Sequence, residues 1–448
     1  SRLKRARTHE TACRFSPRMC RGEHSAMDEI PRESGISEEE FIERYLIPNR
    51  PCILTDVVTS WSVFREWGGL EKFVERFGDV ELSADFSCFP ATDRAAVPNL
   101  DQGPRSAACV RSYLAVHDYL KDWHMQQQLG SDMVPYDLPL YLGGSPIYDW
   151  INGWNAFRGA ASTPPPPNEA GAAIEPGEDY RFCYIGHAGS GTGLHFDVMG
   201  SYSWSANLSG RKRWTFFHAD ALDQLMDEQR ELPAVSHRDF RRAPEDGRLL
   251  GIHGGYFCSQ CCRASAPSSA STLAAPHEHE RCAHGTRPLP PFVEVIQHPG
   301  ELIFVPSCWA HVVENLTDAI SINHNWINAG NLRRMWEFLV KEHANVRREL
   351  LSWGINEDEE FETQTQIVLR ANSKLDFAKF EAYVMRGREM VAEEGRRCDA
   401  RGLVADHTVD GHRRPDELAE SCCSLWAEFS GREVQCAEAL LEQWRRER

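Results

Sequence analysis

Apolar and polar positions follow the period of a β-strand in the middle of the chain and the period of a helix near its end. From Tyr180 to His218, and again through residues 291–328, short runs of branched and aromatic residues alternate with polar ones, which predicts strands. From Asn331 onward, apolar residues recur every three or four positions, as they do on one face of a helix. The pattern therefore predicts a β-rich centre followed by a helical region.

The N-terminal half mixes the two patterns. Ser37, with Glu40 three residues later, forms a capping-box pattern that marks the start of a helix. The branched residues at 50–58 predict a buried strand. We expect a helix over residues 110–129 and a short strand over residues 138–144. Helices are thus expected before and after the β-rich centre.

Composition divides the chain into three parts. Residues 1–27 hold seven Lys or Arg, two acidic residues and little apolar periodicity, so a disordered basic tail is predicted. A β-rich domain is expected over residues 28–330. It is interrupted near 162–179, which is rich in Pro, Ala, Gly and Glu, and near 246–290, which is rich in Ala, Ser, Cys and His. Residues 331–448 form the predicted C-terminal helical region.

Charge and cysteine content narrow the possible functions. The net charge of −17 argues against general binding to nucleic acid or to an anionic membrane, and no apolar run is long enough to cross a bilayer. The 15 cysteines are an odd number scattered along a long chain, which favours free thiols in a reducing compartment. We therefore expect a cytoplasmic protein. The basic segment SRLKRAR leaves a nuclear location as the alternative.

A histidine and an aspartate interrupt an otherwise small and apolar segment, GSGTGLHFDVMGSYSWS at residues 189–205. Successive side chains of a strand point to opposite faces, so His195 and Asp197 are expected to project to the same side. A second imidazole would complete a two-histidine, one-carboxylate set, which holds Fe(II) and leaves three positions open. A bidentate 2-oxo acid and O2 can take those positions.

The second histidine is expected at His311, between the predicted strands ELIFVP and AISINHNW. His298 lies beside a turn and His324 lies on a strand face that is expected to pack, so both are weaker candidates. A lone His-x-Asp pair is more often a surface or hydrogen-bonded pair than a metal site. The glycine-rich turn before the pair, the basic cluster at residues 211–213 and the position of His311 favour the metal site.

The segments GSGTGLHFD, SYSWSANLSGRKRW and ISINHNWIN resemble those of the JmjC family of Fe(II)- and 2-oxoglutarate-dependent oxygenases. The resemblance extends from RPCILTDVV through the helices after Asn331. It implies a mainly β core with flanking helices, namely a double-stranded β-helix, or jelly-roll, cupin-like barrel, followed by a C-terminal helical region. It also implies that the Fe(II) ligands are His195, Asp197 and His311.

The same resemblance implies a set of residues around 2-oxoglutarate. Lys212 matches the lysine that pairs with the distal carboxylate, and a buried dianion needs such a cation because an unpaired buried charge is costly. The other implied positions are Thr192, Tyr141, Ser205 and Asn323. At the last two positions, relatives often carry Asn and Thr, so the residue types differ although both can still form hydrogen bonds.

Within the family, the chain most resembles protein lysyl hydroxylases. That resemblance implies an enzyme with Fe(II), 2-oxoglutarate and O2 that hydroxylates a lysine side-chain carbon of a eukaryotic peptide-chain release factor. The alternatives are an Nε-methyl-lysine demethylase acting on a histone or another protein, and a catalytically silent JmjC scaffold. A zinc-dependent cupin enzyme that does not use 2-oxoglutarate is a further class, and Lys212 and Thr192 argue against it.

The insertion near 246–290 contains a possible second metal site. Cys258 and Cys261 have the spacing of a zinc knuckle, and further Cys and His residues follow some twenty positions later. Those residues are His277, His279, Cys282 and His284. The surrounding composition is typical of a disordered loop. We therefore expect an inserted loop without metal, with structural zinc as the alternative.

Overall fold

The computed structural model describes the barrel, most of the C-terminal helices and parts of the segments between them. The described residues are 29–67, 69, 72–73, 80–85, 111–116, 142, 148–151, 180–186, 188–221, 225, 241–242, 249–251, 256–257, 287–288, 290–358, 360–405 and 415–447. The predicted tail at 1–27 and the insertion at 162–179 lie outside them, as does most of the insertion at 246–290.

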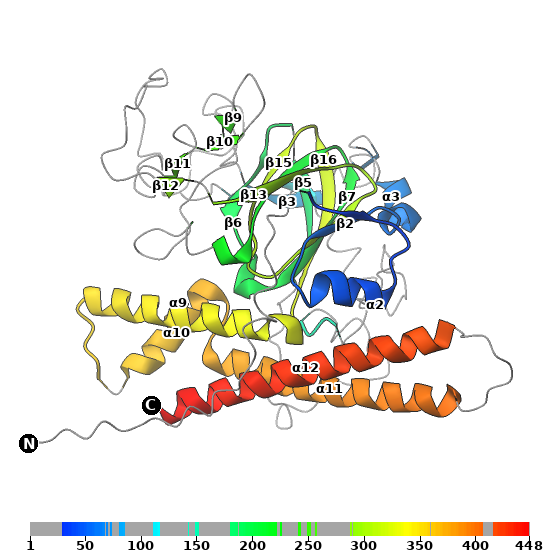
Figure 1. Ribbon diagram of the computed structural model, residues 1–448. Coiled ribbons are helices and arrows are strands. Elements are labelled where there is room, and N and C mark those ends of the chain that lie inside the picture. Colours follow the sequence, from blue (N-terminus) through cyan, green and yellow to red (C-terminus); the bar gives the residue numbers. More distant parts are fainter. Residues whose placement is uncertain are drawn as a thin grey trace, which may run out of the picture.

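Two sheets form the β-rich centre (Figure 1). The larger sheet has the strand order β1-β2-β14-β7-β16-β5, and the smaller one has the order β13-β8-β15-β6. The strands of the larger sheet are β1 (Arg32–Glu33), β2 (Cys52–Leu54), β14 (Leu302–Val305), β7 (Tyr202–Ser209), β16 (Ala319–Trp326) and β5 (Arg181–Gly186). Those of the smaller sheet are β13 (Phe292–Gln297), β8 (Lys212–Phe217), β15 (Ala310–Asn315) and β6 (Gly191–His195).

All neighbouring strands of the two sheets are antiparallel except β1 and β2. Apolar side chains from the inner faces of both sheets pack together between them; Trp214 and Val295 come from the smaller sheet and Ile53 and Ile303 from the larger one. Two antiparallel sheets that share a core in this way form a jelly-roll barrel. The predicted fold class, a mainly β core with flanking helices, is confirmed.

The outer face of the larger sheet is covered by helices. Side chains of β7, β14 and β16 form a second core with helical side chains such as Leu339, Phe380 and Trp426. The C-terminal helices are α9 (Leu332–Ser352), α10 (Phe361–Ser373), α11 (Phe377–Ala405) and α12 (Pro415–Arg446), and Figure 1 shows α11 and α12 side by side below the barrel. The alternation along each strand thus directs one set of side chains to the barrel interior and the other to the helices.

The shorter helices lie before and between the strands. They are α2 (Glu38–Phe41), η1 (Ile42–Leu46), η2 (Val58–Ser60), α3 (Ser62–Glu66), η5 (Val198–Gly200), η6 (Ala219–Ala221) and η8 (Ala329–Asn331). The predicted capping box is confirmed, because the Glu40 amide donates to Ser37 Oγ at 3.2 Å and the Ser37 amide donates to Glu40 Oε2 at 3.0 Å. None of the helices in the described part of the chain combines the length and the apolar character that a membrane crossing requires.

Two local predictions differ from the structure. Residues 111–116 form strand β4 (Arg111–Val116), which pairs with β3 (Val80–Asp85), so the predicted helix over 110–129 is wrong for this part. The segment RSYLAV suits either structure locally, and pairing with β3 selects the strand. In the predicted strand at 138–144 only Leu142 is described, and it lies in a 3-10 turn.

The part of the 246–290 insertion that is described consists of short strands. β10 (Leu249–Gly251) pairs with β9 (Arg241–Arg242), and β11 (Tyr256–Phe257) pairs with β12 (Arg287–Pro288). They form two small sheets of their own, separate from the two sheets of the barrel. The Cys and His residues of the possible zinc site lie outside the described residues.

Candidate metal centre

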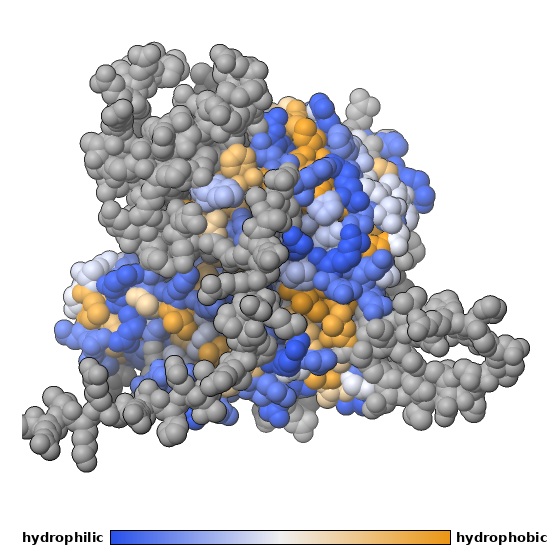
Figure 2. Space-filling model, in the orientation of Figure 1, coloured by the Kyte–Doolittle hydropathy of each residue, from blue (hydrophilic) through white to orange (hydrophobic). Residues whose placement is uncertain are grey.

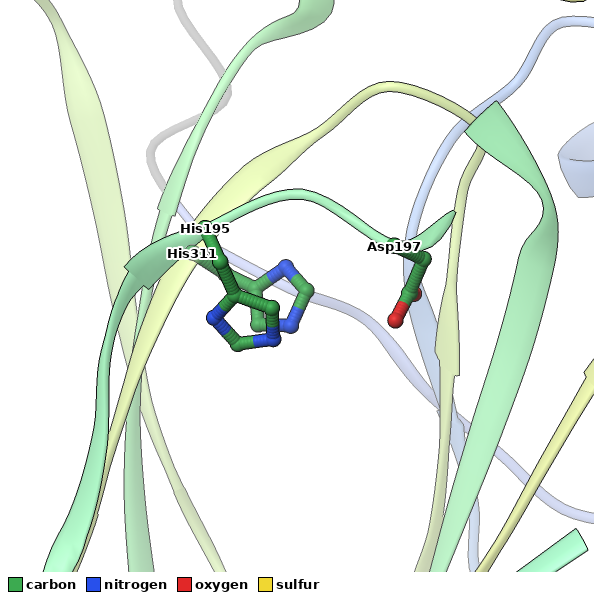
Figure 3. Close-up of side chains that lie close together, drawn as sticks. All are labelled: His195, Asp197 and His311. Atoms are coloured by element: carbon green, nitrogen blue, oxygen red, sulfur yellow. The ribbon is translucent and has the colours of Figure 1, made fainter. Parts of the chain in front are cut away.

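Two histidines and one aspartate meet at one end of the barrel (Figure 3). One ligand atom from each of His195, Asp197 and His311 lies within 4.8 Å of those of the other two. His311 is buried, and the other two residues are half-buried. Among the described residues, this is the group of His, Cys, Asp and Glu that could hold a metal ion.

The two histidines come from neighbouring strands of the smaller sheet. His195 is the last residue of β6, His311 is the second residue of β15, and the two are direct cross-strand partners. Their ring centroids are therefore only 4.2 Å apart. Asp197 lies beyond the end of β6, just before η5, with extended backbone angles (φ −64°, ψ 148°). Its carboxylate lies on the same side as the His195 ring, as expected, although Asp197 is not part of strand β6.

Hydrogen bonds fix the imidazole tautomers. His195 Nδ1 lies 2.8 Å from the Gly193 carbonyl oxygen, and His311 Nδ1 lies 2.9 Å from that of Trp309. A carbonyl can only accept, so each Nδ1 carries the proton and each Nε2 keeps a free lone pair. Burial and, after it, the neighbouring His195 lower the pKa of His311 to about 4. The neutral imidazole is the form that binds a metal.

The carboxylate is oriented by a serine of the larger sheet. Ser203 Oγ on β7 donates to Asp197 Oδ2 at 2.6 Å. A hydroxyl donor of this kind holds a ligating carboxylate in place and is the usual support around a metal site. Imidazole nitrogen and carboxylate oxygen in a two-to-one ratio suit Fe(II). The donor set therefore fits the metal that the sequence predicts.

The turns that bear the ligands are tied together. Ser307 Oγ, in the turn before β15, donates to the Gly200 carbonyl at 2.5 Å in the turn after Asp197. Asn49 holds the same turn from the N-terminal segment: its Nδ2 donates to the Ser307 carbonyl at 2.9 Å, and its Oδ1 accepts from the Ser307 amide at 2.9 Å. The Trp309 indole also donates to the Asn49 carbonyl at 3.0 Å. Asn49 thus positions the segment leading to His311.

We expect Asn49→Gly to weaken Fe(II) retention by about ten-fold or more, because partners that orient metal ligands typically contribute that much. Asn49 has a positive φ of 58°, which glycine adopts without strain, so the change removes the side-chain clamp and keeps the backbone. Metal content after dialysis and the melting temperature are measured together. Asn345→Ala on α9 is the control, and unchanged iron retention in Asn49→Gly would contradict the positioning role.

An irregularity in β6 brings Thr192 to the inner face. His195 pairs with His311 and Thr192 pairs with Val313, so three steps along β6 match two along β15. In a regular strand, residues three apart face opposite sides, and the extra residue of a β-bulge restores the same side. Thr192 is exposed, and it lies on the same strand as the metal ligand His195. Its pairing with Val313, whose side chain belongs to the barrel core, places Thr192 on the inner face of β6.

The basic cluster at residues 211–213 divides between the surface and the interior. Arg211 is exposed, and Arg213 is half-buried in an ion pair with Glu314 at 2.8 Å. Lys212 is only 5% exposed, and its Nζ donates to Ser321 Oγ at 2.6 Å. Burial lowers the pKa of Lys212 to about 8. In the part of the chain that the structure describes, this buried ammonium forms no ion pair with a carboxylate.

A short polar network connects Lys212 to the other predicted residues. The Ser321 hydroxyl that accepts from Lys212 donates to Asn323 Oδ1 at 3.2 Å, and Ser205 Oγ donates to the same oxygen at 3.0 Å. Ser205 and Asn323 are cross-strand partners on β7 and β16, so their side chains share the inner face. The structure therefore brings Ser205, Asn323 and Lys212 together. Tyr141 lies outside the described residues.

Ser203, Asn49 and Ser321 were not among the residues predicted from the sequence. Ser321 could have been found, because it alternates with the apolar Ile320 and Ile322 on β16 and thus faces the interior together with Asn323. Asn49 gives no such signal. It lies 258 residues from Ser307, its partner, and only the folded chain brings the two together.

Comparisons with known proteins point to one family. The family model described as a cupin-like domain matches residues 37–331. The chain is 30% identical over 376 residues to "2-oxoglutarate and iron-dependent oxygenase JMJD4" of Gallus gallus, a match that covers 79% of this chain and 72% of the relative. It is 28% identical over 396 residues to the protein of the same name from Homo sapiens, covering 82% of this chain and 79% of the relative.

A relative with a different printed activity also matches. "Arginine-specific demethylase JMJ20" of Arabidopsis thaliana is 28% identical over 377 residues, which is 80% of this chain and 70% of that protein. Oxygenases and a demethylase thus occur among the relatives.

Proposed function

The chain belongs to the cupin-like family and, within it, to the 2-oxoglutarate- and iron-dependent oxygenases of the JMJD4 type, and from this we propose that it hydroxylates a lysine side-chain carbon of a eukaryotic peptide-chain release factor. The acidic net charge of −17 suits a lysine-bearing protein substrate. Because the 15 scattered cysteines favour a reducing compartment, we also propose a cytoplasmic location, with the nucleus as a further one.

His195, Asp197 and His311 would hold the Fe(II). When bound, Fe(II) supplies coordination sites at which 2-oxoglutarate and O2 react to succinate and CO2, with one oxygen atom entering a C–H bond of the substrate. The role of the chain's own residues is to hold the metal ligands in place and to orient them. The Nδ1 hydrogen bonds of both histidines fix the ring planes, and Ser203 fixes the carboxylate.

Lys212 is proposed to pair with the distal carboxylate of 2-oxoglutarate. Its ammonium is buried on the inner face of the barrel, and there its observed partner is the neutral Ser321 hydroxyl. A buried cation without a carboxylate is costly, and an incoming anion would remove that cost. Thr192, Ser205 and Asn323 would add hydrogen bonds to the cosubstrate. Tyr141 is proposed for the same role on the strength of the family resemblance.

One observation supports this proposal above the others. The inner face of one barrel presents both a cluster of two imidazoles and a carboxylate and, farther along the neighbouring strand β8, the buried ammonium of Lys212. The first suits Fe(II) and the second suits a carboxylate. A ligand that chelates a metal through one end and carries a carboxylate at the other fits both.

The proposed function is tested by mass spectrometry of release factor after incubation with the enzyme, Fe(II), 2-oxoglutarate and O2. A gain of one oxygen atom on a lysine residue is the expected result. The His195→Ala variant serves as the control for non-enzymatic oxidation. Succinate formation without any oxidised lysine in the release factor would contradict this substrate.

Demethylation is the second candidate, because a relative is named an arginine-specific demethylase. Hydroxylation of an N-methyl group gives a product that releases formaldehyde, so the same metal site would serve. The two activities separate in the same measurement, since demethylation removes one methylene unit from a methylated lysine or arginine. A silent scaffold would give neither product and no succinate.

We expect the apparent dissociation constant for 2-oxoglutarate to be constant below about pH 8 and to rise about ten-fold per pH unit above it. The pKa of Lys212 is about 8, and only the protonated amine offers a charge to the carboxylate, so the competent fraction falls as the pH rises through that value. Anaerobic titration of the iron-loaded enzyme measures this. Lys212→Arg, which stays protonated, should show no such rise, and a wild-type profile that is flat to pH 9 would contradict the assignment.

A further inference from the structure

Two large aromatic side chains stand exposed on the inner side of the larger sheet. Phe182 and Tyr184 on β5 have exposed fractions of 37% and 49%. Their cross-strand partners on β16 are Asn323 and Ser321, and paired residues of antiparallel strands share a face. Both rings therefore project to the side on which Lys212 contacts Ser321. Their centroids are 6.0 Å apart and their planes are tilted by 37°.

Tyr184 is surrounded by protein and also reachable by solvent. Burial raises the pKa of the Tyr184 hydroxyl to about 12, and the Asp197 carboxylate is the second cause. Almost half of the side chain is nevertheless exposed. Tyr184 is therefore partly covered by protein and can still be reached by a ligand on the inner side of the sheet. Asp197 is one of the three grouped ligands, so its effect on the Tyr184 hydroxyl puts this ring on the side of the metal centre.

The chemistry of the two rings selects the kind of ligand. The face of a phenyl or phenol ring is partly negative, so it attracts an ammonium group and repels a carboxylate. The carboxylates of 2-oxoglutarate have better partners in the metal and in Lys212. A lysine side chain combines an apolar stem, which packs on a ring, with a cation that a ring face stabilises.

We propose that Phe182 and Tyr184 form an aromatic wall that receives the lysine side chain of the protein substrate and holds it against the metal centre. This inference rests on the proposed function and specifies the part of the site that recognises the substrate. The stem of the lysine would lie along the two rings, with its carbons close to the end of the barrel where His195 and Asp197 lie.

The test replaces each ring by an apolar group without a π face. Phe182→Leu and Tyr184→Leu are compared with Ile185→Ala, the matched control. Ile185 is a similarly exposed apolar residue on the same strand, 36% exposed, and its cross-strand partner Ile320 belongs to the core on the opposite face. For each enzyme, KM is measured for release factor and for 2-oxoglutarate, together with succinate formation in the absence of release factor.

In both leucine variants, KM for release factor should rise on the order of ten-fold, the loss expected for a desolvated cation on a ring face. KM for 2-oxoglutarate and succinate formation without release factor should stay within about two-fold of wild type. A rise in KM for 2-oxoglutarate as large as that for release factor would assign the rings to the cosubstrate pocket and overturn the proposal. Unchanged constants for both ligands would overturn it too.

A second measurement does not depend on release factor. Saturation-transfer NMR is recorded anaerobically on the iron-loaded enzyme with 2-oxoglutarate, using Nα-acetyl-lysine methylamide and its neutral norleucine analogue as probes. Wild type should favour the lysine probe, and both leucine variants should lose that preference. This result would support the wall even if release factor proved not to be hydroxylated, whereas equal transfer from both probes in wild type would overturn the wall.

Discussion

His195→Ala is expected to abolish 2-oxoglutarate turnover while the barrel stays folded. The His195 ring is half-buried at the end of β6, where it faces His311 and Asp197 and not the apolar core. Its removal takes away one of three ligands, and a single neutral imidazole with one carboxylate retains Fe(II) poorly. Succinate formation and bound iron are measured side by side, and the melting temperature reports on the fold.

The matched control is His298→Ala. His298 is an exposed histidine in the turn between β13 and β14, so its loss should leave both iron content and turnover unchanged. Asp197→Ala should behave as His195→Ala does, since it removes the carboxylate that Ser203 orients. Normal turnover in either ligand variant would remove the iron assignment.

Lys212→Ala should raise the apparent constant for 2-oxoglutarate by about two to four decades, because breaking one side of a buried ion pair typically costs about 3–5 kcal/mol. Iron retention should change little by comparison, since Lys212 is not one of the three grouped ligands. Titration of 2-oxoglutarate at saturating Fe(II) measures the effect. The same titration separates this role from that of an exposed lysine, for which changes within about 0.5 kcal/mol are normal.

Two variants complete the Lys212 experiment. Lys212→Arg should recover only part of the affinity, because the guanidinium is longer and forked while the ammonium here meets a single hydroxyl, that of Ser321. Arg213→Ala removes a neighbouring charge that is paired with Glu314 on the outer face of the smaller sheet, and it should leave the constant unchanged. If Arg213→Ala weakened 2-oxoglutarate binding and Lys212→Ala did not, the pairing would be wrong.

Strands of the larger sheet contact both the metal ligands and Lys212. Ser203 on β7 orients Asp197, and Ser321 on β16 receives the Lys212 ammonium. Tyr184 on β5 is the cross-strand partner of Ser321. His195, His311 and Lys212 therefore come from the smaller sheet, and Asp197 comes from the turn after β6. Ser203, Ser321 and Tyr184 come from the larger sheet. All of these strand side chains lie on the inner faces of the two sheets.

Much of the site was predictable because its residues lie in short, regular segments. His195 and Asp197 are two residues apart, and extended backbone alone puts them on one side. His311 was expected as the second ligand because it lies between two predicted strands, and it is grouped with His195 and Asp197. His324 was expected on a packed strand face, and its Nε2 lies 2.8 Å from Asp149 Oδ2. The choice of Lys212 rested on the family resemblance, and the structure shows this side chain buried at the start of β8.

The remaining features needed contacts between distant parts of the chain. A helix was expected over residues 110–129, but residues 111–116 form a strand because they pair with β3. The inward position of Thr192 depends on the bulge in β6, which is defined only against β15. The clamp by Asn49 joins segments that are 258 residues apart.

The sequence by itself determined the fold class, the alternation that turns each strand's faces inward or outward, and the residues offered as metal ligands, because these follow from local backbone geometry and side-chain type. Only the tertiary structure decided which of Arg211, Lys212 and Arg213 is buried, and that Phe182 and Tyr184 stand exposed on the inner side of the larger sheet. Burial and electrostatic environment are properties of atoms brought together from separate segments, so no single stretch of sequence contains them.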